Sequence, residues 1–232
     1  MISKKTSIIL LACTMVVINF FIITQFTAFD SRLVRNITTL AFFVLFIIFG
    51  GLKKIKLTLV YLLFISTDVC IMFYDYPFYN NLASVLKSLG LLVMIWHLIP
   101  RFKIELESKK SVVGSLLIIG FGGALFLELL ELATMKFNNT LHIFLYACCA
   151  LLYLILFILV VNYNLRYNSM RSIVCVFFVF SIALSDFLAF ISYYLAIGEF
   201  YYPTRLFHIL GITLLTAYAV LPFKKEELFE EN

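Results

Sequence analysis

The sequence predicts an all-α fold, a polytopic integral membrane helical bundle of about eight transmembrane helices. Of the 232 residues, 63% are hydrophobic and only 13% are charged, and the mean hydropathy is +1.05. Soluble domains carry about 25% charged residues. The apolar residues gather into eight runs, most of them near the length of about 20 helical residues that crosses a bilayer. Because the loops between the runs are short, we expect one domain over residues 1–232.

The eight predicted spans follow one another along the chain. They lie near residues 6–26, 37–52, 57–74, 81–100, 111–135, 141–163, 172–195 and 204–220. The first has the position of a signal peptide, but its apolar run is longer than a signal peptide needs and no A-x-A cleavage pattern follows. The second is short unless it begins at Leu33, which would bring Arg35 into the headgroup region.

Most of the later spans are apolar runs that contain an ionisable side chain. The third contains Asp68, the fourth Lys87, the fifth Glu128, the seventh Asp186 and the eighth His208. A charged group in hydrocarbon costs at least about 2.5 kcal/mol, so such groups should face the bundle interior and pair. At a rise of 1.5 Å per residue, each of the five lies roughly 4 to 7 Å from the middle of its span toward the outer face. They therefore predict one polar layer just outside the midplane.

The sequence suggests partners within this layer without fixing them. Asp68 and Lys87 lie on neighbouring helices and could form a structural ion pair, whereas Asp186 has no cation on its own helix. His97 falls at the inner end of the fourth span, away from the layer. For each histidine, the alternative to a functional role is a hydrogen-bonded packing role.

The basic residues predict the orientation of the bundle. One end carries thirteen of them: Lys4, Lys5, Lys53, Lys54, Lys56, Arg101, Lys103, Lys109, Lys110, Arg166, Arg171, Lys224 and Lys225. The other end carries four: Arg32, Arg35, Lys136 and Arg205. Because cytoplasmic loops are enriched in Lys and Arg, we expect both termini in the cytoplasm, in a bacterial cytoplasmic membrane. The net charge of +5 is then a topology signal and gives no reason to expect nucleic acid as a partner.

Two stretches of the chain resemble each other and suggest an internal 4 + 4 repeat. The stretch STDVCIMFYDYPFY from Ser66 and the stretch LSDFLAFISYYLAIGEFYYP from Leu184 each run from Asp through an apolar half-helix to a Tyr-Pro pair. In each case the next helix contains Leu-Gly, at Gly90 and Gly211. A chain this rich in aromatic residues also produces such a match by chance.

The residues around the two aspartates resemble the lysoplasmalogenase (YhhN-like) family of multi-pass membrane proteins. The run VCVFFVFSIALSDFLAF is similar to that family's apolar run ending in Ser-Asp, here Ser185 and Asp186. The run LLFISTDVCIMF is similar to its Gly-Asp helix, with Asp68 as the acid. His97 follows at a spacing like that of the family's next-helix histidine, and Tyr146 falls where the family often has tyrosine.

The resemblance implies hydrolysis of the vinyl ether bond of a lysoplasmalogen to a fatty aldehyde and a glycerophospho-alcohol. Its partners would be a lysophospholipid substrate and the surrounding membrane lipids. Such cleavage uses an acid that protonates carbon and a carboxylate that activates water. We assign Asp186 as the proton donor and Asp68 as the base, with the reverse assignment also open. Arg35 or Lys87 would hold the phosphate.

The remaining candidate residues have supporting roles in this hypothesis. They are His97, Glu128, Tyr146, Ser185 and His208. We expect no cofactor, because the chain has no G-x-G-x-x-G, P-loop or C-x-x-C-H motif. We also expect no metal. A zinc-dependent membrane amidase would need converging histidines, and the chain has neither H-x-x-x-H nor H-E-x-x-H.

Two other functions compete with lipid hydrolysis. Intramembrane acids and a lysine also build proton or cation relays, so a small proton- or cation-coupled transporter is the main alternative. Its mark would be helices broken at the midplane, for which Gly120, Gly122 and Gly123 are the candidates, although Gly120 with Ala124 also fits a small-xxx-small packing face. A membrane scaffold whose acids only lock the helices together would tolerate neutral substitutions.

Overall fold

The computed structural model shows a bundle of long helices. It describes residues 3–102 and 140–222 and, between these ranges, residues 120, 123, 124, 127, 128, 130–132, 134 and 135. The long helices are α1 (Lys4–Gln25), α2 (Ala28–Ile48), α3 (Ile55–Met72), α4 (Pro77–Leu98), α6 (Thr140–Tyr167), α7 (Met170–Tyr194) and α8 (Tyr201–Val220). Short 3-10 helices are η1 (Gly51–Lys53), η2 (Ile99–Arg101) and η3 (Gly198–Phe200). All seven long helices are long and apolar enough to cross a membrane, which confirms the predicted helical membrane bundle.

Several helices begin at residues that satisfy their free backbone N–H groups. The Thr27 hydroxyl accepts a hydrogen bond from the Asp30 backbone, and the Asp30 carboxylate accepts one from Thr27, which makes a capping box before α2. Ser169 and Ser172 make the same reciprocal arrangement before α7. Pro77 opens α4, where its missing N–H costs nothing. These capping residues therefore fix where α2, α4 and α7 begin.

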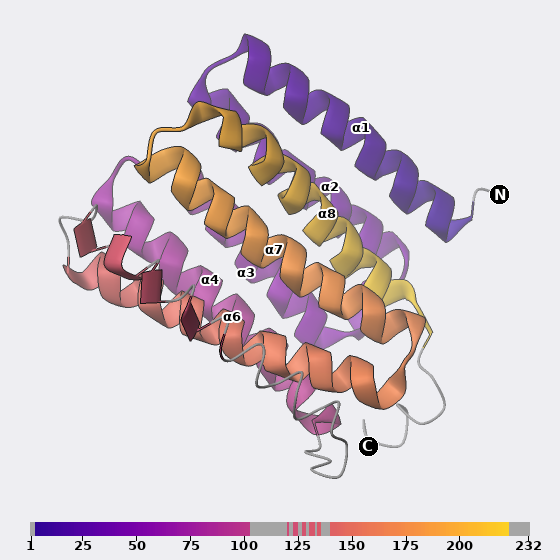
Figure 1. The fold of residues 1–232 in the computed structure, drawn as a ribbon. Coiled ribbons are helices and arrows are strands. Elements are labelled where there is room, and N and C mark those ends of the chain that lie inside the picture. The colour runs from indigo at the N-terminus through magenta and orange to yellow at the C-terminus, as the bar shows by residue number, and fades with distance from the viewer. Residues whose placement is uncertain are drawn as a thin grey trace.

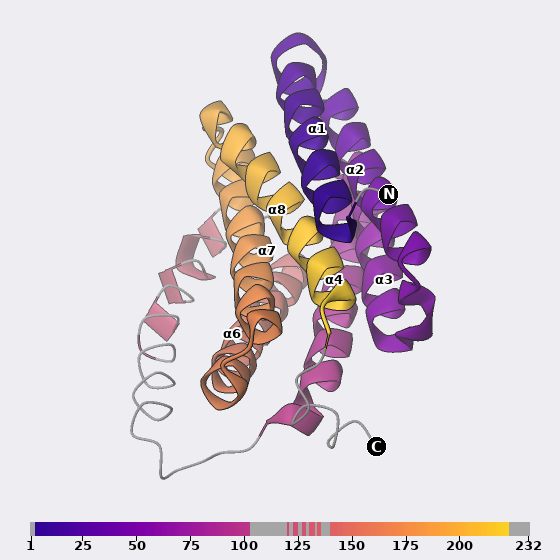
Figure 2. The ribbon, with the colours of Figure 1, turned by 90° about the vertical axis from the view of Figure 1, so that its right-hand side faces the viewer.

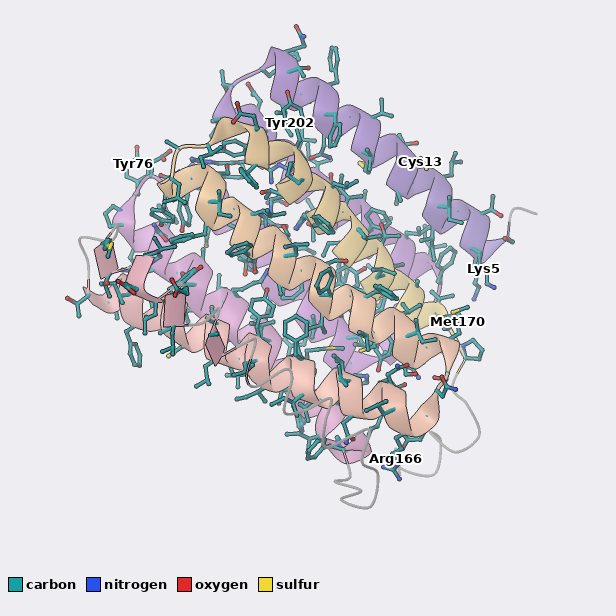
Figure 3. The ribbon with its side chains drawn as sticks, in the orientation of Figure 1. Lys5, Cys13, Tyr76, Arg166, Met170 and Tyr202 are labelled. Carbon is teal, nitrogen blue, oxygen red and sulfur yellow. The ribbon has the colours of Figure 1, made fainter. Side chains whose placement is uncertain are left out.

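The helices run up and down the bundle, and six of them close into a ring (Figures 1 and 2). Packing proceeds from α2 to α3, α4, α6, α7 and α8, and α8 packs back on α2. Helix α1 lies against α2 and α8, outside this ring. The connections near residues 26, 75 and 197 meet at one end, called here the Tyr76 end. Figure 3 shows Tyr76 and Tyr202 there, with Lys5, Arg166 and Met170 at the opposite, N-terminal end.

The interior of the ring is packed toward the N-terminal end. Phe46 and Tyr61 are fully buried and their rings lie 4.9 Å apart. The Tyr61 hydroxyl forms a hydrogen bond of 2.5 Å with the Thr216 hydroxyl, which joins α3 to α8 through the middle. Gly90 allows α3 and α4 to approach closely, because a Cβ at this position would overlap the Phe64 ring. This half of the bundle therefore has a solid core.

The boundaries of α2 correct the sequence prediction. The predicted span began at residue 37, and the helix begins at Ala28. Its first turns carry Arg32, Arg35 and Asn36, all buried. These polar residues face the interior of the bundle and lower the hydropathy of the segment. A prediction from hydropathy alone therefore starts the helix too late. The other described spans agree with prediction to within a few residues, and the predicted span 111–135 falls mostly outside the described residues.

Candidate functional site

A cavity occupies the Tyr76 half of the ring. It has a volume of about 520 Å³ and is lined by residues from α2, α3, α4, α6, α7 and α8. We call it the ring cavity. Along α7 its lining runs from Phe180 to Tyr194, about 20 Å at the helical rise of 1.5 Å per residue. Apolar side chains such as Leu154 and Phe157 surround its inner part, and arginines lie at the other end. The cavity is therefore long and amphipathic.

Asp186 presents its carboxylate to this cavity. It lies on α7, and its side chain is 30% exposed, whereas that of its partner Lys87 is 10% exposed. The Lys87 ammonium on α4 lies 2.9 Å from Oδ2 of Asp186. The Tyr153 hydroxyl on α6 donates a hydrogen bond of 2.5 Å to the same oxygen. Three helices thus fix one carboxylate about midway along the lining of α7.

Asp68 lies in a second cluster and is more deeply buried. Its side chain is 2% exposed and accepts a hydrogen bond of 2.7 Å from Nε of Arg35. The Thr39 hydroxyl donates to Oδ2 at 2.6 Å and also lies 3.0 Å from Nε2 of His208. Nε2 of His208 is itself 3.5 Å from the Asp68 carboxylate. Arg35 is part of the cavity lining, whereas Asp68 lies behind it.

The observed pairing corrects the one suggested by the sequence. The sequence suggests that Asp68 could pair with Lys87, and it offers Asp186 no cation on its own helix. Instead, Lys87 pairs with Asp186, and Arg35 pairs with Asp68. Helix α3 packs against both α2 and α4, so the order of the helices permits either partner. The pairing is decided by the faces they present, since Asp68 contacts Arg35 on α2 and Lys87 reaches Asp186 on α7.

The two clusters are neighbours. Arg35, which holds Asp68, lines the same cavity as Lys87 and Asp186. Four of the five residues predicted to share a layer, namely Asp68, Lys87, Asp186 and His208, therefore do lie together. Glu128 does not join them, because its side chain is exposed in the described part of the structure.

The other predicted supporting residues take different positions. Tyr146 lines the cavity and packs against Phe190, with ring centroids 5.3 Å apart. Ser185 is fully buried and donates a hydrogen bond of 3.0 Å to the Thr204 carbonyl, which joins α7 to α8. His97 lies at the N-terminal end, where its Nε2 is 3.0 Å from the Tyr218 hydroxyl. Ser185 and His97 therefore lie outside the cavity lining.

An arginine-rich group closes the Tyr76 end of the cavity. Arg32 donates two hydrogen bonds to Asp75, at 2.8 and 3.2 Å, and the Tyr193 hydroxyl donates a third at 2.8 Å. The Arg32 guanidinium beside Asp75, helped by the Tyr193 hydroxyl, holds the pKa of the Asp75 carboxyl below its usual range. Arg205 on α8 lines the same region and donates to the Ser31 hydroxyl at 3.1 Å.

Several of these residues are not predicted as site residues from the sequence. The sequence places Arg32 and Arg205 among the basic residues of loops, whereas both lie in helices and are buried. Thr39 and Tyr153 gave no signal, because threonine and tyrosine are ordinary in apolar spans. The usable signal was the spacing of Arg32 and Arg35, which places both on one face of a helix once the span is extended to Ala28.

Comparison of the chain with protein-family models, with curated proteins and with solved structures gave no match. Over residues 3–102, 140–222 and the described positions between them, no three His, Cys, Asp or Glu side chains come together as metal ligands. The geometry and chemistry of the ring cavity are therefore the basis for a functional conclusion.

Proposed function

We propose that this protein is a membrane-embedded lipid hydrolase that cleaves the vinyl ether bond of lysoplasmalogens inside the ring cavity. The observation that carries the proposal is the position of Asp186. Its carboxylate reaches the cavity between an apolar inner part and an arginine-rich end. The resemblance around Ser185 and Asp186 to the lysoplasmalogenase family supports the same reaction.

The shape and lining of the cavity suit a lipid with one chain. The chain would lie along Leu154, Phe157 and Phe180, whose apolar side chains would replace the lipid tails that surround it in the membrane. The phosphate would lie among the arginines, since guanidinium groups bind phosphate oxygens with strong, charge-assisted hydrogen bonds. This arrangement places the bond between chain and glycerol near Asp186.

The proposed reaction needs one carboxyl that acts twice. The cycle begins when Asp186, which is ion-paired with Lys87 in the structure, takes up a proton. Protonated Asp186 then gives this proton to the vinyl carbon β to the ether oxygen, and the double bond becomes an oxocarbenium ion. The resulting carboxylate stabilises this cation and accepts a proton from the attacking water, which forms a hemiacetal. The hemiacetal collapses with transfer of its hydroxyl proton to the leaving oxygen. A fatty aldehyde and the glycerophospho-alcohol leave, and Asp186 is again protonated.

In this proposal Asp68 becomes a positioning residue. Its carboxylate holds Nε of Arg35, and Arg35 reaches the cavity. Lys87 and Tyr153 position Asp186 in the same way, each through a direct contact with Oδ2. The two-carboxylate assignment made from the sequence is thereby reduced to one acid that touches the reacting atoms.

The proposal is tested by hydrolysis in D₂O. The purified protein in detergent is incubated with a defined lysoplasmalogen, and the aldehyde is analysed by mass spectrometry. Because solvent exchanges with the carboxyl proton, the aldehyde should carry one deuterium on the carbon next to the carbonyl. A lysophospholipid with an acyl ester in place of the vinyl ether is the matched control and should remain intact.

Other outcomes would overturn the proposal. Release of fatty acid from the ester control would indicate a different hydrolase. Absence of aldehyde together with pH-driven ion uptake by proteoliposomes would favour the transporter. The seven long helices that the structure describes are continuous, so they lack the midplane breaks expected of that alternative, and the Gly120–Gly123 candidate lies only partly within the described residues.

A further inference from the structure

The charges around the ring cavity do not balance. Three of its four basic side chains are each matched to a carboxylate: Arg32 to Asp75, Arg35 to Asp68, and Lys87 to Asp186. The fourth is Arg205, which has no carboxylate within ion-pair distance among the residues that the structure describes. The arginine-rich end therefore carries one positive charge in excess.

Arg205 is buried as well as unmatched. Its residue is 3% exposed, its one hydrogen bond is to the Ser31 hydroxyl at 3.1 Å, and its Nε has no hydrogen-bond partner in the described part of the chain. Arg35 and Arg32 repel it electrostatically, and Asp68, which is already bound to Arg35, attracts it from beyond ion-pair distance. Burying a cation costs several kcal/mol unless an anion compensates it. Within the described part of the chain, the charge of Arg205 is therefore only partly compensated.

From this imbalance we infer that the cavity selects a single-chain lipid whose headgroup is negative overall, a phosphodiester joined to an uncharged alcohol, with its phosphate on Arg205. The inference rests on the proposed function in taking the ring cavity as the lipid site. A zwitterionic headgroup would add an ammonium beside Arg32 and Arg205. The carboxylate nearest that end, Asp75, already accepts hydrogen bonds from Arg32 and Tyr193. A negative headgroup cancels the excess charge, and a zwitterionic one does not.

The test measures binding, so it is independent of hydrolysis. Titration calorimetry of the purified full chain in detergent compares lysophosphatidylglycerol with lysophosphatidylcholine, both with the same acyl ester. Both lipids carry the phosphate, and only the choline lipid adds an ammonium beside Arg32 and Arg205, so we expect the glycerol lipid to bind at least about tenfold more tightly. Arg205→Gln removes a charge-assisted hydrogen bond to the phosphate and should weaken binding of the glycerol lipid by about tenfold. For the choline lipid the same loss is offset by relief of the repulsion on the ammonium, so its binding should change by less than about twofold.

Two controls keep the result interpretable. Ser31→Ala removes the hydroxyl that receives the Arg205 hydrogen bond but keeps the charge, so the preference for the glycerol lipid should persist. Glycerol 3-phosphate without a chain reports on a free phosphate ligand. If it binds as tightly as the lysolipid, the site takes free phosphate and the lipid assignment is wrong. Should Arg205→Gln fail to fold, the wild-type comparison of the two lipids still decides.

The binding experiment and the hydrolysis experiment can fail independently of each other. Equal binding of the two lipids, or equal loss of both in Arg205→Gln, would contradict the headgroup preference even if aldehyde is released from a lysoplasmalogen. A clear preference for the glycerol lipid without aldehyde release would keep the inference and overturn the hydrolase.

Discussion

Lys87 on α4 and Asp186 on α7 meet across the ring cavity, with the ammonium nitrogen 2.9 Å from the carboxylate. The two residues lie 99 positions apart in the chain. Lys87 also lies over the Phe64 ring, 4.7 Å from its centroid, so its charge is held from two sides. Asp186 is thereby fixed in one orientation toward the cavity, as a reacting carboxyl requires.

Tyr153→Phe tests how Asp186 is oriented. The substitution removes the hydrogen bond to Oδ2 and leaves the ring in place, so aldehyde release should fall by about tenfold while the fold is kept. The pH profile of the remaining activity should also shift, since a donor to the carboxylate is lost. Tyr76→Phe, at an exposed position outside the cavity lining, is the control and should leave both unchanged. An unaltered pH profile in Tyr153→Phe would show that Tyr153 does not act on Asp186.

A double-mutant cycle tests the buried pair of Asp68 and Arg35. Removing one partner leaves a buried charge uncompensated, so Asp68→Asn should lower the free energy of unfolding by about 3 kcal/mol. Arg35→Gln should do the same. The double variant should be less destabilised than the sum of the two, because neither charge remains. Chemical denaturation in mixed micelles measures all three. Strict additivity would contradict a direct interaction.

Much of the fold was predictable from the sequence, because a bilayer requires long apolar helices. The spans for α3, α4, α6, α7 and α8 agree with the structure within a few residues. The start of α2 was not predictable from hydropathy, since Arg32 and Arg35 make its first turns polar although they face inward. The order of the helices around the ring was not predictable either. Hydropathy indicates how many times the chain crosses the membrane, but it does not indicate which helices pack against each other.

The Asp75 ion pair predicts a loss of stability in acid. Since Arg32 lowers the folded-state pKa of Asp75 below the unfolded value of about 3.9, the pair stabilises the fold fully above about pH 5 and loses that contribution as the pH falls through the folded value. The Asp75 side chain is 66% exposed, so screening by water limits the effect to at most about 1 kcal/mol. Asp75→Asn should lower the Tm slightly at pH 7, and the difference should shrink as the pH falls below about 4. Glu199→Gln, an exposed carboxylate at the same end, serves as the control.

Gly211 should not tolerate a larger side chain. An added Cβ would overlap the Ile182 side chain and reach 3.4 Å from the Ile182 backbone nitrogen, where α8 packs on α7. Gly211→Val should therefore destabilise the protein by about 1 to 3 kcal/mol, measured by thermal unfolding in detergent. Gly198→Val places the same side chain in open space and should cost less. Equal destabilisation by the two substitutions would mean that α7 and α8 can move apart without loss of stability.

The candidate site was predictable only in part. Asp68, Lys87, Asp186 and His208 stood out because ionisable groups are expensive inside a membrane, and the structure brings them together. Their pairing depends on the rotation of each helix about its axis and on which helix it faces. Neither can be predicted from a single sequence. The internal repeat remains a prediction, since its second half includes the span 111–135.

The most direct test of the central claim is aldehyde release from a lysoplasmalogen by the purified protein, measured beside Asp186→Asn. General acid–base catalysis contributes about 10²- to 10⁴-fold, so the amide should lower the rate by at least about 10²-fold while the protein still elutes as a folded species like the wild type. Glu199→Gln should keep full activity. Full activity in Asp186→Asn would contradict the account, because no proton could then come from the residue that the cavity presents.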